Sequence, residues 1–90
     1  MKILINLFGV EVRNKQAFRL DSGSLSLKSV VKAVDAQEPG LFQRFLQEDF
    51  SPVDGTVVLV NGRNILSLAR WDTLIDDGDE ISFMVPIAGG

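Results

Sequence analysis

The chain ends in Gly89-Gly90, and this pair is the part of the sequence best suited to chemistry. Glycine has no Cβ, so two in a row can pass a narrow channel and accept any backbone angle. The reactive group that they deliver is the α-carboxylate of Gly90, which is a poor acylating agent because its oxygen leaves badly. Adenylation by ATP would give it a good leaving group, and a sulfur nucleophile could then make a C-terminal thiocarboxylate.

The residues before this pair favour the same interpretation. Pro86 ends regular strand pairing because it lacks an N–H group, and no charged side chain lies between Glu80 and Gly90. The segment 86–90 can extend over about 17 Å, enough to reach a buried pocket in another protein. We therefore expect one domain at residues 1–85 and a flexible tail at 86–90. Two terminal glycines also occur by chance in about one chain in 200, so an incidental terminus is the alternative.

The composition excludes several other kinds of function. The chain has no cysteine and no histidine, which removes thiolate nucleophiles, zinc-thiolate sites and the commonest general base. A self-contained hydrolase or metalloenzyme is not expected, although carboxylate chemistry stays open. The net charge is −3 and the basic residues look scattered along the sequence, so we expect no nucleic-acid partner. The acidic residues concentrate late, as a solvated face or as a surface that steers a basic partner: Asp72, Asp76, Asp77, Asp79 and Glu80.

The N-terminal region gives no sign of a membrane protein. No apolar run approaches the length needed to cross a bilayer. The first apolar stretch is interrupted by Asn6 and followed by Glu11 and Arg13, with no small-residue cleavage site. We expect a cytoplasmic protein without a membrane partner.

Three segments alternate between apolar and other residues, as strands do. Residues 2–8 and 17–20 predict an antiparallel hairpin, and residues 80–85 predict a last strand with Ile81 and Phe83 facing one way. Phe8 and Met84 then lie on the sheet face opposite the helix predicted below. If they are exposed there, they form an apolar patch for a partner, whereas the alternative is ordinary packing.

Helices are predicted by apolar spacings of three and four residues. Ser26 is a good N-cap, and an apolar stripe follows it at Leu27, Val30, Val31 and Val34. Residues 41–46 predict a second, shorter helix. The run Val57–Val60 predicts a central strand buried on both faces, and Asn61-Gly62 predicts a hairpin turn into a brief strand at 64–66. One main helix packed on one face of a mixed sheet is an α+β fold.

Several motifs resemble those of the MoaD family, the small sulfur-carrying subunit of molybdopterin synthase. The resemblance covers the whole chain and is carried by LVNGRNI at 59–65, DTL at 72–74, DGDEI at 77–81 and VPIAGG at 85–90. It implies a β-grasp fold like that of ubiquitin. It also implies that Gly89 and Gly90 form the active tail, with Gly90 bearing the sulfur, and that Pro86, Ile87 and Ala88 enter the partner with them.

The resemblance further implies which partners act on the chain. An adenylating enzyme resembling the ubiquitin-activating enzyme would use ATP on Gly90, and a larger MoaE-like synthase subunit would receive the tail. The chain itself would be a carrier and not an enzyme, with no bound cofactor or metal. Trp71 before Asp72 resembles the thiamine-pathway carrier ThiS instead, so the thiamine pathway or another thiolation pathway is the alternative recipient. An interaction module without sulfur chemistry is the rival class.

Overall fold

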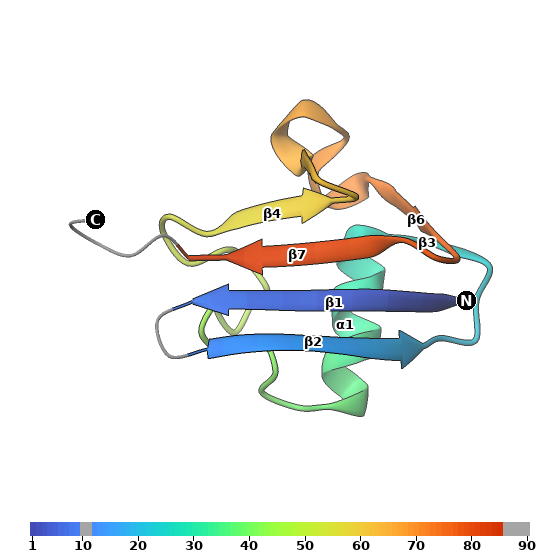
Figure 1. The fold of residues 1–90 in the computed structure, drawn as a ribbon, viewed down its shortest axis with the longest axis horizontal. Coiled ribbons are helices and arrows are strands. Elements are labelled where there is room, and N and C mark those ends of the chain that lie inside the picture. The colour runs from blue at the N-terminus through green and yellow to red at the C-terminus, as the bar shows by residue number, and fades with distance from the viewer. Residues whose placement is uncertain (10–11, 86–90) are drawn as a thin grey trace.

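The fold is built on a five-stranded mixed sheet, which we describe from a computed structural model covering residues 1–9 and 12–85. The strand order is β2-β1-β7-β4-β5, and β1 and β7 are parallel while the other neighbouring strands are antiparallel (Figure 1). The bounds are β1 Lys2–Gly9, β2 Val12–Arg19, β4 Val57–Val60, β5 Arg63–Asn64 and β7 Glu80–Met84.

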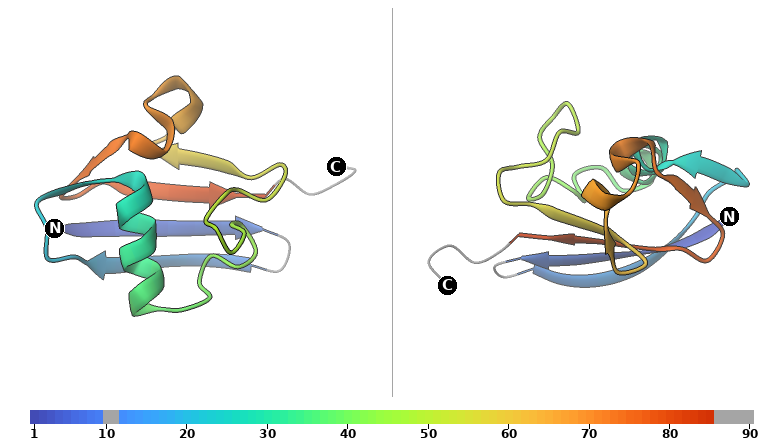
Figure 2. Two further views of the ribbon diagram at one scale, coloured as in Figure 1. Left: turned by 180° about the vertical axis from the view of Figure 1, so that it is seen from behind. Right: turned by 90° about the horizontal axis from the view of Figure 1, so that it is seen from above.

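The helix α1, Leu27–Gln37, crosses one face of this sheet (Figure 2). It begins as predicted, because the Ser26 side chain accepts a hydrogen bond from the Ser29 backbone N–H. The predicted stripe Leu27, Val30, Val31 and Val34 is fully buried against the sheet. The N-cap and the apolar stripe together explain why a segment rich in β-branched valine is helical.

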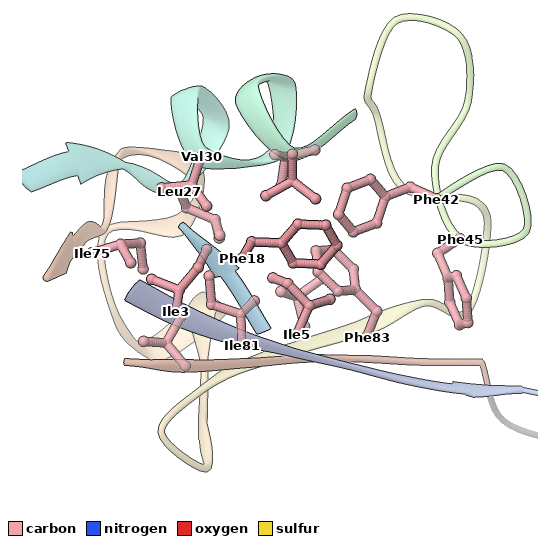
Figure 3. Close-up of a cluster of buried hydrophobic side chains, with 14 of the residues drawn as sticks. Ile3, Ile5, Phe18, Leu27, Val30, Phe42, Phe45, Ile75, Ile81 and Phe83 are labelled. Carbon is pink, nitrogen blue, oxygen red and sulfur yellow. The ribbon is translucent and has the colours of Figure 1, made fainter. Parts of the chain in front are cut away.

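The core lies between α1 and the sheet, as Figure 3 shows. Alternate side chains of β1 and β7 enter it, because successive residues of a strand point to opposite faces. Phe83 lies at its centre, with ring centroids 4.9 Å from Phe42 and 6.3 Å from Phe45. The largest fully buried side chains are Phe45, Phe83, Ile3, Ile5, Leu27, Ile75, Ile81, Val30, Val31 and Val34.

Residues 41–46 do not form the predicted second helix. They are a series of turns, although Phe42, Phe45 and Leu46 are buried as the apolar spacing indicated. Phe45 and Leu46 both donate to the carbonyl of Phe42, and the Phe45 carbonyl then accepts from Val53 across the loop. The backbone closes one helical turn and is then drawn into bonds with residues 51–53, so a longer helix cannot continue.

The strand β4 differs from the prediction in its burial. Val58 and Val60 are buried, whereas Val57 and Leu59 on the other face are only partly buried. It lies between β7 and the short edge strand β5, so its predicted position inside the sheet is confirmed. A continuous apolar run therefore serves here as a strand with one covered face.

The segment after β4 forms the predicted turn but differs from the prediction beyond it. Asn61 and Gly62 have φ of 51° and 82° and form the predicted turn. The return strand β5 is only Arg63–Asn64, and a 3₁₀ helix at Ile65–Ser67 replaces the rest of it. A second 3₁₀ helix, Arg70–Asp72, precedes β6, Leu74–Asp76, which pairs with β3, Ser24–Ser26, in a separate two-stranded sheet.

Candidate functional site

The strand β7 leads directly to the predicted tail and lies in the middle of the sheet. It is paired with β1 on one side and β4 on the other, and the Val85 N–H donates to the Phe8 carbonyl at 3.0 Å. The chain therefore remains bonded to the sheet up to Val85. Residues 86–90, with the predicted roles of Pro86 to Gly90, lie outside the described residues, so those predictions stay predictions.

The sheet face opposite α1 carries an apolar row where β7 ends. We call this the open face, since α1 covers only the other one (Figure 2). Phe8, Met84 and Val57 are aligned across β1, β7 and β4, because Met84 is the register partner of both Phe8 and Val57. Met84 is 38% exposed, and Phe8 and Val57 are partly buried. The predicted placement of Phe8 and Met84 on this face is confirmed, and their role in partner binding remains a proposal.

A polar group lies at the centre of the open face. Asn6 is only 5% exposed, and its Nδ2 donates to Glu80 Oε2 at 2.5 Å and to Ser82 Oγ at 3.1 Å. Lys15 Nζ lies 3.9 Å from the same Glu80 oxygen. These contacts hold the carboxylate of Glu80 against the sheet. The polar cluster of Asn6, Glu80 and Lys15 therefore lies between the apolar row and the N-terminal end of β1.

Two of the late acidic residues, Asp77 and Asp79, stabilise a turn through their side chains. Asp77 Oδ1 accepts from the Lys2 N–H at 2.7 Å, and Asp79 Oδ2 accepts from the Asp76 N–H at 2.8 Å. Asp79 Oδ1 also accepts from Asn61 Nδ2 at 3.0 Å. Within residues 1–9 and 12–85, no group of three or more acidic side chains is arranged to hold a metal ion. These bonds give Asp77 and Asp79 a structural role in the turn. That the late acidic residues steer a basic partner stays a prediction.

Trp71 is partly buried and packs against the edge of the core. It lines a hollow of about 290 Å³ with Phe50 and Pro52, at the side of α1. This hollow is on the covered side of the sheet, whereas the apolar row at the end of β7 is on the open face. Trp71 is therefore not part of the surface beside the predicted tail.

The strand β2 carries a basic row that was not predicted from the sequence. Arg13, Lys15 and Arg19 look scattered in the sequence, but the register places all three on the open face, opposite Phe8, Asn6 and Lys2 of β1. All three are exposed, and the Arg13 guanidinium lies 6.0 Å from the centre of the Phe8 ring. The signal in the sequence was that positions 13, 15 and 19 are separated by even numbers of residues. This spacing puts the three side chains on one face only if the whole segment is a single strand.

The sequence matches the ThiS family over residues 5–90. The chain belongs to this family. The match runs to Gly90 and so includes the predicted active tail. A curated relative, the small archaeal modifier protein 3 of Haloferax volcanii, is 34% identical over 73 residues, which are 81% of this chain and 77% of that protein.

Two solved structures support the fold that the ThiS family implies. The crystal structure of SAMP1 from Haloferax volcanii superposes with a TM-score of 0.74 at 23% identity, covering 100% of both chains. The solution structure of Urm1 from Trypanosoma brucei gives 0.66 at 19% identity, covering 99% of this chain and 95% of that one. The fold is therefore the expected ubiquitin-like β-grasp. No helix among the described residues is long and apolar enough to cross a bilayer.

Proposed function

We propose that this chain is a carrier that is activated at Gly90 and bears sulfur there as a thiocarboxylate. A carboxylate oxygen of Gly90 attacks the α-phosphorus of ATP, which releases pyrophosphate and leaves an acyl-adenylate. Hydrosulfide from a sulfur donor then attacks the carbonyl carbon, AMP leaves, and the sulfur remains on Gly90 as the thiocarboxylate. The observation that carries the proposal is the ThiS family match, which extends through Gly89-Gly90.

The geometry of the described residues supports delivery of the tail to a second protein. The adenylating enzyme supplies the ATP site, and the chain supplies the tail and a surface that binds that enzyme. The apolar row of Phe8, Met84 and Val57 lies beside Val85, the last described residue before the tail. A partner that binds this row is correctly placed to receive residues 86–90, and burying Met84 stabilises the complex.

The proposal also names the protein that receives the sulfur. The motifs resembling MoaD favour a larger, MoaE-like synthase subunit, which passes the sulfur to a pterin precursor in molybdenum cofactor synthesis. Thiamine synthesis or another thiolation pathway is the alternative recipient. The chemistry at Gly90 is the same in each case, because only the nucleophile that receives the sulfur changes.

A second candidate function is protein modification. It is favoured by the 34% identical relative, whose name is small archaeal modifier protein 3. In this reaction a lysine amine of a target protein attacks the Gly90 adenylate, AMP leaves and an isopeptide bond forms. The two functions share the activation step and differ in the nucleophile that follows it.

The deciding experiment uses the lack of cysteine in the chain. The protein is incubated with ATP, a sulfur donor and its activating enzyme, then with a thiol alkylator, and its intact mass is measured. Met1 and Met84 are thioethers, so a thiocarboxylate is the most readily alkylated sulfur at neutral pH. We expect one alkyl group on Gly90 that requires ATP and is lost when Gly90 is deleted. Absence of the adduct with a demonstrably active cognate enzyme would contradict the carrier mechanism.

A paired substitution tests the apolar row. Met84→Ser should raise the KM for activation roughly tenfold with little change in kcat, since it removes contact area and leaves the tail intact. Leu66→Ser is the matched control, because Leu66 is 65% exposed but lies on the 3₁₀ helix beyond β5. Equal effects of the two substitutions would show that the row is not the docking surface.

A further inference from the structure

The strand β2 leaves one edge of the sheet open. It is the last strand on its side, and the Leu20 N–H donates to the Met1 carbonyl at 2.8 Å, toward β1. Backbone groups of successive residues in an antiparallel strand point alternately to either side. Phe18 and Gln16 therefore face β1 as Leu20 does. The outward N–H and C=O groups belong to Arg13, Lys15, Ala17 and Arg19.

Part of this edge is already occupied. Gln37 Nε2, at the end of α1, donates to the Arg19 carbonyl at 2.9 Å, which confirms that this residue faces outward. For Arg13, Lys15 and Ala17, the described chain provides no outer hydrogen-bond partner. The free stretch is thus residues 13–17, long enough to pair with a short added strand.

The same residues supply a concentration of positive charge. Arg13, Lys15 and Arg19 project onto the open face, and Lys2 lies opposite Arg19. Among the described strand residues on this face, Glu80 is the one acidic side chain, and Asn6 and Lys15 already contact it. This row is positive although the net charge of the whole chain is −3. It favours a partner segment of negative charge.

A hollow of about 290 Å³ lies where this edge meets the apolar row. Its lining includes Arg13, Lys15 and Phe8, together with the carboxylate of Glu80, which Asn6 and Lys15 already contact. A carboxylate entering the hollow would be within reach of Arg13, and of Lys15 beside Glu80, and an apolar neighbour would contact Phe8. Both kinds of contact suit a protein segment that continues from the apolar row onto β2.

We propose that the outer edge of β2 and its basic row bind an acidic, extended segment of a partner protein, which pairs with residues 13–17 as an added strand. Strand addition of this kind obtains affinity from main-chain hydrogen bonds and specificity from alternate side chains. A peptide backbone matches the alternating outward N–H and C=O groups, whereas a nucleic acid has no such pattern. The proposal does not depend on whether Gly90 carries sulfur.

The test uses the full chain and a synthetic probe, a peptide of alternating glutamate and valine. Binding is followed by the amide chemical shifts of the isotope-labelled protein, in low salt and again in high salt. The test variant is R13Q/K15Q/R19Q, and the matched control K28Q/K32Q/R63Q loses the same charge from exposed positions on α1 and β5. If the triple test variant does not fold, the single variants R13Q and K15Q replace it.

We expect the largest shifts at residues 13–17, with affinity roughly tenfold lower in R13Q/K15Q/R19Q and unchanged in the control. High salt should weaken binding, because the charges are exposed. A peptide with lysine in place of glutamate should not bind. The proposal is overturned if the peptide causes no shifts, which is expected if the basic row only protects the edge strand from aggregation. It is also overturned if the test variant and the control variant lose affinity equally. Tighter binding of a single-stranded oligonucleotide at the same salt would also overturn it.

Discussion

Asn61 holds the turn between β4 and β5 in a backbone conformation that residues with a Cβ rarely adopt. Its φ is 51°, its Oδ1 accepts from the Glu80 N–H at 2.9 Å, and its Nδ2 donates to Asp79 at 3.0 Å. We expect Asn61→Ala to lower the free energy of unfolding by about 2 kcal/mol, through backbone strain and lost hydrogen bonds. Urea unfolding at neutral pH measures the change.

Asn61→Gly separates the two causes in this turn. Glycine accepts the positive φ but cannot make either side-chain bond, so its loss of stability should be smaller than that of Asn61→Ala. An equal loss in both variants would show that the strain contributes nothing. This comparison matters for the site, because the side chain of Asn61 bonds the turn to Asp79 and Glu80, where β7 begins.

The pKa of the Asp49 carboxyl lies below its ordinary value. The Ser51 hydroxyl donates to its Oδ1 at 2.5 Å and the Ser51 N–H at 3.0 Å, and these bonds lower the pKa of Asp49. Because the folded pKa lies below the unfolded one, the bonds stabilise the protein above the unfolded pKa, and this contribution is lost as the pH falls through the folded pKa. Ser51→Ala should raise the pKa of Asp49 toward its ordinary value, as measured by carboxyl chemical shifts in an NMR titration. Ser29→Ala is the control, because the hydroxyl of Ser29 accepts from Ser26 and is not among the groups that lower the pKa of Asp49. The titration should not change in Ser29→Ala, and an unmoved pKa in Ser51→Ala would contradict the assignment.

The first turn of α1 depends on its cap. The Ser26 hydroxyl accepts from the Ser29 N–H at 3.2 Å, and no acidic residue in the first turn supports that end of the helix. We expect Ser26→Ala to lower the free energy of unfolding by about 1 kcal/mol, since one helix donor loses its partner. Urea unfolding of Ser26→Ala and of Ser29→Ala provides the comparison. Ser29→Ala keeps the backbone donor, so a loss as large as that of Ser26→Ala would argue against the cap.

The strand β7 contributes to both the core and the candidate site, because its successive side chains point to opposite faces of the sheet. Ile81 and Phe83 enter the core, while Ser82 and Met84 lie on the open face. The chain then continues to Val85, which is bonded to β1. We therefore expect a change that loosens Phe83 also to disturb its neighbours Met84 and Val85.

The stability of the whole domain depends strongly on Phe83. It is fully buried and lies against Phe42 and Phe45, as Figure 3 shows. Phe83→Ala should cost about 3–5 kcal/mol, a large part of the stability of a small domain. We expect calorimetry to show Tm lowered by more than about 12 °C. Leu66→Ala, at a position 65% exposed, should change stability by less than about 0.5 kcal/mol, and a similar loss in both would contradict this view of the core.

Features that depend on neighbouring residues could be predicted from the sequence. The cap at Ser26, the stripe of α1 and the turn at Asn61-Gly62 each follow from local geometry, and each is confirmed. The alternation in β1 and β7 likewise placed Phe8 and Met84 on the open face. The helix predicted at 41–46 was wrong, because bonds to residues 51–53 and burial of the aromatic rings outweigh a short apolar periodicity.

The sequence by itself determined the alternating strands, the main helix and the motifs of a sulfur-carrier family up to Gly90. These features depend on the types and spacing of residues that are close together in the chain. Only the tertiary structure decided the strand order, which puts β7 between β1 and β4 and aligns Phe8, Met84 and Val57. The same pairing assembles Arg13, Lys15 and Arg19 into one row at a free edge. The physical reason is that register and strand order depend on contacts between residues far apart in the chain, which local patterns do not specify.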